Sequence, residues 1–208
     1  MKYPLVIFDF DGTLADSFPF FMQAQHVLAQ RHGFAAMPEA RLDALRRLGT
    51  RELMREMNVP AWKLPMVAAD FVRMMRQAPP VPLFAGVPEV LRELREGGIR
   101  LGILTSNSLD NVRRVLGVEL MAAIELLDGG AHMLGKHRRI ARMLKQARAP
   151  GTQAIYIGDQ LSDGEAARRA GVAFGAVGWG YAHPDSLRAA QPEEFFDTVQ
   201  ELGRFAMR

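Results

Sequence analysis

The chain contains no cysteine among its 208 residues and no apolar run long enough, at about 18 residues, to cross a membrane as a helix. The first absence excludes disulfides, thiolate catalysis, and zinc or iron–sulfur sites with cysteine ligands. The short apolar run at 5–8 ends in an aspartate, with no small-residue cleavage site after it, so it does not resemble a signal peptide. We therefore expect a cytoplasmic protein with no membrane partner.

Lysine is scarce as well. Only Lys2, Lys63, Lys136 and Lys145 are lysine among 26 basic residues, in a chain of net charge +3. The arginines occur singly or in pairs, and no basic stripe interleaved with aromatic residues or helix-turn-helix signature is present. This distribution is typical of solvated helix faces, so we expect no nucleic-acid partner. The scarcity of lysine makes each one easier to assign a role.

The hydrophobic pattern divides the chain into two kinds of region. With 49% hydrophobic and 24% charged residues, the composition is that of a folded globular protein and excludes intrinsic disorder. Between 17 and 76, four apolar stripes at helical spacing are separated by Gly33, Gly49 and Pro60, which predicts a small helical unit without strands. A proline cluster at 79–82 closes this region.

The remainder of the chain alternates between strand and helix patterns. The expected strands are 5–8, 99–104, 122–126, 154–157 and 172–177, the last being the final strand. The expected helices are 88–96, 110–116, 136–148, 163–170 and a closing helix at 193–207. Such alternation predicts a parallel sheet with helices on both faces.

Polar side chains follow three of these strands: Asp9 and Asp11, then Thr105, Ser106 and Asn107, then Asp159 and Asp163. Ligands of doubly wound sheets bind outside the carboxyl ends of the strands, where these residues would gather. Gly12 lets the chain turn directly after Asp11, and Thr13 can hydrogen-bond the turn. Carboxylates from two neighbouring strand ends form an all-oxygen site of the kind that favours Mg²⁺.

Other interpretations of these residues fit less well. A calcium-binding EF-hand loop starting at Asp9 would need glycine and glutamate where Leu14 and Phe20 stand. Simple capping of turns is the common role of an aspartate after a strand, but it does not explain two acidic strand ends, a hydroxyl strand end and a lone lysine together. The glycine motifs of dinucleotide and P-loop sites are absent after every expected strand.

Two further features lie near the expected site. An expected turn at Gly49-Thr50 is flanked by three arginines, Arg46, Arg47 and Arg51. Contact with the substrate and simple exposure at the surface are equally open roles for them. Trp179 and Tyr181, in a glycine-rich stretch after the last expected strand, should belong to a loop that packs near the site.

Four segments of the chain carry motifs in a recognisable order. They are VIFDFDGTLADS at 6–17, LGILTSN at 101–107, LGKH at 134–137 and AIYIGDQLSD at 154–163. Together they resemble the first to fourth motifs of the haloacid dehalogenase-like (HAD) superfamily, and the match spans 1 to about 190. The pattern is most similar to the phosphoglycolate phosphatase-like members.

This resemblance implies an α/β fold with a Rossmann-like core and an inserted helical cap. The parallel sheet should have its first strand at the centre. The catalytic core would comprise 1–15 and 83–208, and the cap domain 16–82, with hinge segments at 14–17 and 79–82.

The resemblance also implies roles for the residues at the strand ends. Asp9 would be the nucleophile that forms an aspartyl phosphate, and Asp11 the acid that protonates the leaving alkoxide and later activates water. Mg²⁺ would be held by Asp9, the backbone carbonyl of Asp11, and Asp159. Thr105 and Lys136 would hold the phosphoryl oxygens.

The remaining residues of the motifs would assist. Ser106 and Asn107 would contribute to substrate binding, and Asp163 would orient Lys136 or a metal-bound water. Gly12 and Thr13 would support the turn after the first strand.

The function implied is Mg²⁺-dependent hydrolysis of a small phosphate monoester, with phosphoglycolate as the leading substrate. A true dehalogenase of the superfamily lacks the second aspartate, so Asp11 favours phosphate chemistry. A phosphosugar mutase of the same superfamily and a non-catalytic phospho-binding regulatory module are the alternatives. The expected partner is a small phosphorylated metabolite, and the expected state a monomer or weak homodimer.

Overall fold

A parallel β-sheet forms the centre of the molecule. The structure is a computed structural model that describes residues 2–130 and 135–206, so Leu134 of the third motif and Met207 of the expected closing helix lie outside the described residues. Within those ranges the sheet has six strands in the order β3-β2-β1-β4-β5-β6, all paired in parallel. The strands are β1 (Leu5–Phe8), β2 (Arg100–Leu104), β3 (Ile124–Asp128), β4 (Ala154–Gly158), β5 (Ala173–Val177) and β6 (Glu194–Phe196).

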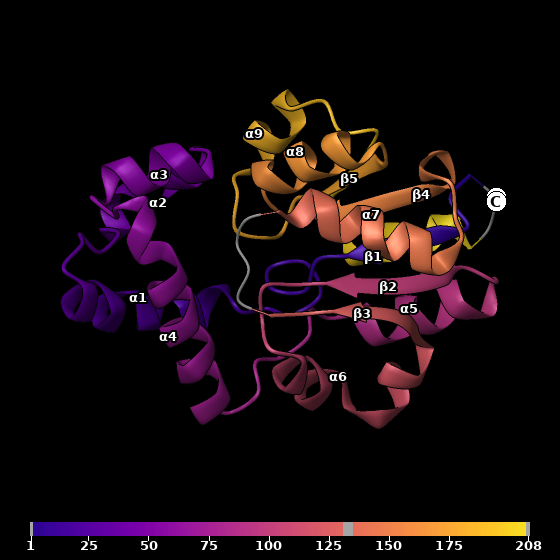
Figure 1. Ribbon diagram of the computed structural model, residues 1–208, viewed down its shortest axis with the longest axis horizontal. Helices are drawn as coiled ribbons and strands as arrows, with labels where there is room; N and C mark the ends of the chain where they lie inside the picture. Colours follow the sequence, from indigo (N-terminus) through magenta and orange to yellow (C-terminus); the bar gives the residue numbers. More distant parts are fainter. Residues whose placement is uncertain (1, 131–134, 207–208) are drawn as a thin grey trace.

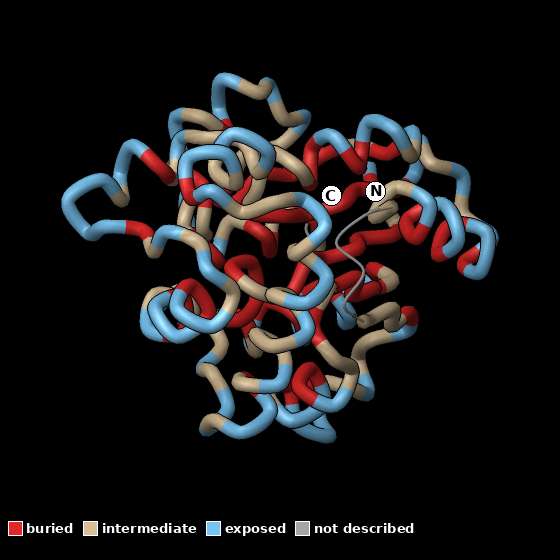
Figure 2. Tube along the Cα trace, turned by 60° about the vertical axis from the view of Figure 1, so that its left-hand side comes forward, coloured by how far each residue is buried: buried red, intermediate tan, exposed pale blue. Residues whose placement is uncertain are grey.

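Strand β1 occupies the interior position that the sequence predicts. Leu5 is in register with Arg100 of β2 on one side and with Ala154 of β4 on the other. All four residues of β1 are buried, because helices cover both faces of the sheet. Figure 2 shows buried segments, coloured red, in the interior of the molecule. The prediction of a Rossmann-like α/β core is confirmed.

The helices of the core form two layers (Figure 1). One face is covered by α5 (Val87–Glu96) and α6 (Leu109–Ala123), the other by α7 (Lys136–Ala147), α8 (Leu161–Ala170) and α9 (Pro184–Ala189). Side chains alternate along β1, so Val6 and Phe8 pack in the first layer and Leu5 and Ile7 in the second. The apolar run at 5–8 therefore belongs to two hydrophobic cores at once.

Four helices between β1 and α5 lie to one side of the sheet, on the left in Figure 1. They are α1 (Phe18–His32), α2 (Leu42–Arg46), α3 (Thr50–Glu56) and α4 (Leu64–Gln77), and the predicted breaks at Gly33, Gly49 and Pro60 separate them. The two connecting segments run side by side. Asp16 N donates to Pro82 O at 2.8 Å, and Phe84 N donates to Leu14 O at 3.0 Å. Short 3₁₀ turns occupy Glu39–Arg41, Ala61–Lys63, Gly151–Gln153 and Val199–Phe205.

The predicted closing helix at 193–207 is wrong, and so is the prediction that 172–177 is the last strand. Residues 194–196 instead form β6, which pairs with β5 at the edge of the sheet. The turns that follow are 3₁₀ rather than α-helical, and they bury Leu202 and Phe205 in the same core as α5. A three-residue strand is too short to show an alternating pattern, so pairing with β5 decides its conformation.

The helix predicted at 110–116 is longer in the structure. Gly117 breaks the helical geometry, with φ 68° and ψ 176°, but helical turns resume and α6 continues to Ala123. Leu116 and Leu120, on either side of the break, are both buried in the core. Strand β3 consequently begins at Ile124 instead of 122.

Arg139 on α7 fixes the ends of β2 and β3, where part of the expected site begins. Its Nη2 donates to Thr105 O at 3.1 Å and to Asp128 Oδ1 at 2.7 Å, and its side chain is 9% exposed. Arg142 pairs with the same carboxylate but is 67% exposed. We expect Arg139→Met to lower the free energy of unfolding by about 2 kcal/mol, because it leaves a shielded carboxylate with one surface partner.

The control is Arg142→Met, which should cost less than about 1 kcal/mol because an exposed ion pair contributes little. Urea unfolding of the two variants, followed by circular dichroism, measures the difference. Equal losses would show that Arg139 has no special structural role.

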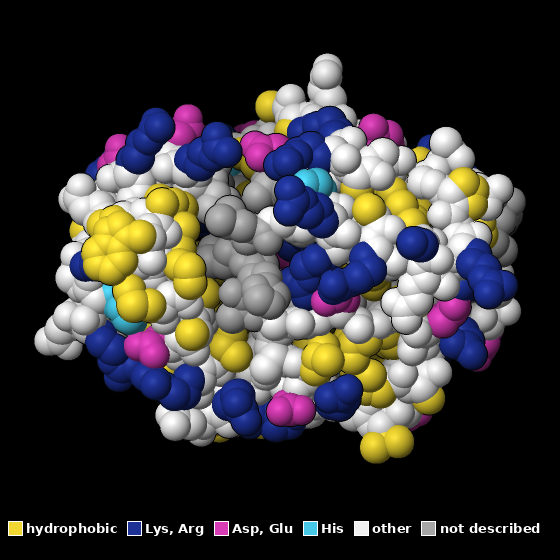
Figure 3. Space-filling model, viewed as in Figure 1, with side chains coloured by type: hydrophobic (Ala, Val, Ile, Leu, Met, Phe, Trp, Pro, Cys, Tyr) yellow, Lys and Arg dark blue, Asp and Glu magenta, His cyan; other side chains and the backbone are white. Residues whose placement is uncertain are grey.

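Charged side chains are dispersed over the surface. Figure 3 shows Lys and Arg side chains scattered among acidic and apolar ones across one face. Several arginines are paired with acids, as in Arg92 with Glu119 and Arg100 with Glu125. In 2–130 and 135–206, no helix has the length and apolar character needed to cross a membrane.

Candidate active site

The polar residues predicted to gather at the carboxyl ends of the strands do lie together. Asp9 follows β1, Thr105 follows β2 and Asp159 follows β4, and these three strands are neighbours in the sheet. All three side chains are buried. Buried polar groups need hydrogen-bond or ionic partners, so the partners of these three side chains define the site.

Three carboxylates form the centre of the site. Asp9, Asp159 and Asp163 each offer an oxygen, and these oxygens lie within 4.8 Å of one another. Lys136 Nζ donates to Asp9 Oδ2 at 3.0 Å and to Asp163 Oδ1 at 2.6 Å. The other oxygen of Asp163 accepts a hydrogen bond from Gln160 N at 3.0 Å, which fixes this carboxylate at the start of α8. One lysine thus faces three carboxylates, and the excess negative charge suits a divalent cation.

Burial and charge shift the pKa values of this cluster. Burial raises the pKa of Asp9 to about 7, although the Lys136 ammonium acts in the opposite direction. Burial, together with the charges of Asp163 and Asp9, raises the pKa of Asp159 well above its usual range. Burial lowers the pKa of Lys136, but the carboxylates of Asp163 and Asp9 outweigh it and hold that pKa well above its usual value. The raised pKa values of Asp9 and Asp159 indicate that Lys136 alone does not balance the negative charge of the cluster. A bound cation would supply the additional positive charge.

Asp11 lies apart from this cluster, although only one residue separates it from Asp9. Its carboxylate accepts hydrogen bonds from Asn107 Nδ2 at 3.0 and 3.3 Å. Burial raises the pKa of Asp11, while the hydrogen bond from Asn107 acts against the rise. A carboxyl group with a raised pKa that lies beside a cation-binding cluster, but does not belong to it, can carry a proton to and from a substrate.

Asn107 is held in place by its own neighbours. Its backbone N donates to Thr105 Oγ1 at 2.9 Å, and its Oδ1 accepts from Asn111 Nδ2 at 2.8 Å. The sequence suggested a substrate-binding role for Asn107; the structure places its amide against Asp11. Asn111, on α6, is a buried supporting residue that the motifs do not include, and its spacing of four residues from Asn107 is the sequence signal that could have indicated it.

The loop after β5 supports Asp159 from the other side. Asp159 Oδ1 accepts from Thr13 Oγ1 at 3.2 Å, and its Oδ2 accepts from Tyr181 N at 2.7 Å. Arg46 reaches the same loop from α2: its Nε donates to Tyr181 O at 2.8 Å and its Nη2 to Gly180 O at 2.7 Å. The loop that the sequence placed near the site therefore touches both a core carboxylate and a helix of the inserted segment.

Gly12 is required by geometry at the turn after β1. Its φ is +79°, and a Cβ there would lie 2.3 Å from Asp159 Oδ2 and 2.6 Å from Tyr181 Cδ1. We expect Gly12→Ala to reduce kcat/KM for every substrate by at least about tenfold, because the clash displaces a carboxylate of the site in addition to the usual left-handed strain of about 1–2 kcal/mol.

A matched control exists for this variant. Gly171 has φ +71°, and a Cβ there would meet no atom of a non-neighbouring described residue within 4 Å, so Gly171→Ala carries the strain without the clash. It should lower the melting temperature while leaving kcat/KM nearly unchanged. Steady-state kinetics of the two variants test whether Gly12 is needed for the geometry of the site. Equal activity in both variants would contradict that role.

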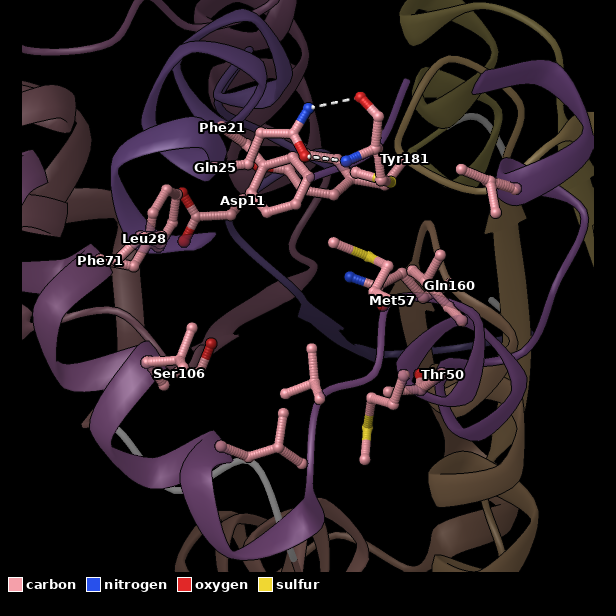
Figure 4. A pocket seen from close by; sticks show the side chains of 18 of the residues that line it. Asp11, Phe21, Gln25, Leu28, Thr50, Met57, Phe71, Ser106, Gln160 and Tyr181 are labelled. Carbon is pink, nitrogen blue, oxygen red and sulfur yellow. Dashed lines mark hydrogen bonds between the residues drawn. The ribbon is translucent and has the colours of Figure 1, made fainter. Parts of the chain in front are cut away.

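A pocket opens between this site and the four inserted helices (Figure 4). Its volume is about 280 Å³, and Asp11, Ser106 and Asn107 belong to its wall. Figure 4 shows Phe21, Leu28 and Phe71 on one side of the space, with Met57 and Thr50 across from them. The pocket therefore adjoins the carboxyl ends of the strands.

Comparison with known proteins finds matches over most of the chain. The model of the family described as haloacid dehalogenase-like hydrolase matches residues 6–177. A phosphoglycolate phosphatase of Synechococcus elongatus is 31% identical over 199 residues, covering 95% of this chain and 94% of that protein. A phosphoglycolate phosphatase of Pseudomonas syringae is 28% identical over 214 residues, covering 95% and 78% respectively. A solved haloacid dehalogenase-like hydrolase from Streptococcus pneumoniae shares the fold, with a TM-score of 0.78, 19% identity and 98% of each chain covered.

Proposed function

Since the chain belongs to the haloacid dehalogenase-like hydrolase family, we propose that it is a Mg²⁺-dependent phosphatase that works through an aspartyl phosphate on Asp9. The family and the phosphatase relatives make it a hydrolase of phosphoric monoesters. The observation that carries the mechanism is the buried cluster of Asp9, Asp159 and Asp163 around Lys136. This cluster combines a nucleophile, a place for a cation and a fixed positive charge.

The residues present fit a Mg²⁺ ion. Carboxylate oxygens of Asp9 and Asp159 lie within one cluster, and the donor set is entirely oxygen, as Mg²⁺ prefers. The backbone carbonyl of Asp11 is the further ligand that we assign, and Asp163 is near enough to orient a bound water. When bound, the ion would neutralise charge between the carboxylates and a phosphoryl group.

The chain's own residues account for the chemical steps. Asp9 attacks phosphorus with one carboxylate oxygen, and the bond from phosphorus to the ester oxygen breaks. Lys136 Nζ, 3.0 Å from Asp9 Oδ2, stabilises the charge that spreads over the phosphoryl oxygens, and the Thr105 hydroxyl donates to one of them. Asp11 gives its proton to the departing alkoxide. It then takes a proton from the water that attacks the phosphorus of the aspartyl phosphate, which releases phosphate and restores Asp9.

We further propose that 16–82 acts as a cap domain over this site. The helices α1–α4 come from one insertion, and both of its connections leave the core together at Asp16 and Pro82. Contacts to the core such as Arg46 with the loop at Tyr181 lie beside the site itself. A cap in this position excludes bulk water and limits the substrate to a small phosphorylated metabolite. The names of the relatives make phosphoglycolate the first ester to assay.

The cheapest test of the proposal is hydrolysis of p-nitrophenyl phosphate with and without metal. We expect turnover with Mg²⁺, its complete loss with EDTA, and recovery when Mg²⁺ is added in excess. Mg²⁺ should also raise the melting temperature of the wild type, because binding to the native state stabilises it. In Asp159→Asn both the thermal shift and the activity should disappear. Activity that persists in EDTA would contradict the assignment of the cation.

A further inference from the structure

We infer that the pocket above Asp11 accepts an uncharged, apolar leaving group the size of an aromatic ring, and that it disfavours a leaving group bearing a carboxylate. The inference rests on the proposed phosphatase function and concerns the alcohol portion of its substrate. It follows from the wall of the pocket and the charges around it.

The inserted helices do not fill their own interior. Few apolar side chains of this segment are fully buried in the structure as described: Ala24, Leu28, Ala29, Met37, Leu45, Met57 and Met75. Apolar side chains that point toward the same space remain half-buried, including Leu48, Leu53, Met54, Val67 and Phe71. Apolar surface left facing a cavity is stabilised when an apolar group covers it, so the wall itself favours an apolar occupant.

Aromatic rings line the part of the pocket nearest to Asp11. Tyr181 lies 5.1 Å from Phe18 and 5.6 Å from Phe21, and Phe21 lies 5.9 Å from Phe71, measured between ring centroids. These rings come from α1, α4 and the loop after β5, and they line the same pocket as Asp11. Two of these three pairs, Tyr181 with Phe18 and Phe21 with Phe71, are edge-to-face. An aromatic ring bound beside them could make further contacts of this favourable kind.

Two positively charged side chains, one in the pocket wall and one beside it, already have other partners. Arg46 is the one cationic side chain among the described residues of the wall, and two of its nitrogens already donate to backbone carbonyls of the core loop. Its guanidinium also lies over the ring of Phe18, 5.2 Å from the centroid. Arg47, its neighbour, is paired at the surface with Asp43 and Asp185. A carboxylate buried in this pocket would lose water without gaining a dedicated ion pair, which is costly.

The wall also holds a few uncharged polar groups. Thr50, Ser106 and Gln160 line the pocket, and Figure 4 shows them around its edge. Groups of this type can orient a ring substituent such as a hydroxyl, but they do not neutralise a charge. The wall therefore selects among leaving groups by their shape and their apolar contacts.

The decisive comparison uses benzyl phosphate and phosphoglycolate. Both release an alkoxide, so they make similar demands on the acid, and they differ mainly in the charge and apolar character of the leaving group. We expect kcat/KM to be at least about tenfold higher for benzyl phosphate. In the series from ethyl to butyl phosphate, each added methylene should raise kcat/KM about fourfold while space remains. A preference for phosphoglycolate, or no dependence on chain length, would overturn the inference.

A pair of matched variants tests the pocket itself. Met54 on α3 lines the pocket, whereas Met66 on α4 is 45% exposed and does not. Met54→Lys should lower kcat/KM for benzyl phosphate about tenfold and raise it for phosphoglycolate, and Met66→Lys should leave both unchanged. Equal effects of the two variants would overturn the inference, and if Met54→Lys does not fold, the wild-type comparison decides alone.

Failure of the inference and failure of the proposed function give different results. Acetyl phosphate needs no pocket, so its Mg²⁺-dependent hydrolysis reports the phosphatase chemistry alone, and its absence would count against the function. Calorimetric titration with benzylphosphonate and phosphonoacetate, neither of which can be hydrolysed, reports the pocket alone. Binding of benzylphosphonate at least about tenfold tighter supports the inference, and the reverse order overturns it.

Discussion

Replacing Asp9 with asparagine should abolish turnover of every phosphate ester, with kcat lowered by at least about 10⁴-fold. The amide is nearly the same size as the carboxylate but cannot form an acyl phosphate. It also removes one of the two carboxylates that hold Lys136 Nζ, at 3.0 Å in the wild type. Because the loss lies in the nucleophile, good and poor leaving groups should be affected alike.

Steady-state assays with p-nitrophenyl phosphate and benzyl phosphate measure this loss. The matched control is Asp43→Asn on α2, whose carboxylate is 72% exposed and pairs with Arg47 and His183, away from the carboxylate cluster. It should retain wild-type activity on both substrates. Circular dichroism should show Asp9→Asn to be folded, and residual activity above about one-hundredth of wild type would remove Asp9 from the nucleophile's role.

Asp11→Asn should have an effect that depends on the leaving group. The variant keeps the backbone carbonyl at 11 but loses the proton donor that Asn107 holds in place. Benzyl alkoxide needs a proton to depart, whereas p-nitrophenolate is stable without one. We expect kcat for benzyl phosphate to fall by about 10³-fold, and the attack on p-nitrophenyl phosphate to be far less affected.

The second step separates this role from a structural one. Asp11 should also activate the water that releases phosphate, so Asp11→Asn should accumulate phosphoenzyme when the leaving group is good. Rapid mixing with p-nitrophenyl phosphate should then show a burst of p-nitrophenol close to one per active site, followed by slow turnover. Equal losses on both esters without a burst would assign Asp11 a structural role and place the acid elsewhere.

Much of the core could be predicted from the sequence because its signals are local. The apolar run at 5–8 ends at Asp9, and Ala154–Gly158 ends at Asp159, so each strand marks its own carboxyl end. Parallel pairing then brings those ends together without further information. The same logic places Thr105 beside them, and the lone Lys136 falls between two of the carboxylates.

Features that depend on distant parts of the chain could not be predicted. The edge strand β6 exists because β5 offers an open edge, and three residues carry too little pattern to reveal it. The hydrogen bond from the Asn107 amide to Asp11 depends on how the two side chains are oriented after β2 and β1, which the adjacency of the strands does not determine. The pocket depends on how four helices fail to fill their interior, and apolar spacing along each helix is the same whether the space is filled or open.

The measurement that tests the central proposal most directly is chemical trapping of the phosphoenzyme. Acid quench of the enzyme within milliseconds of mixing with substrate, followed by borohydride reduction and peptide mass spectrometry, converts a phosphorylated aspartate to homoserine. The aspartyl-phosphate mechanism predicts homoserine at Asp9, enriched in Asp11→Asn and absent in Asp9→Asn. Homoserine at another aspartate, or none at any time point in a variant that still shows a burst, would contradict it.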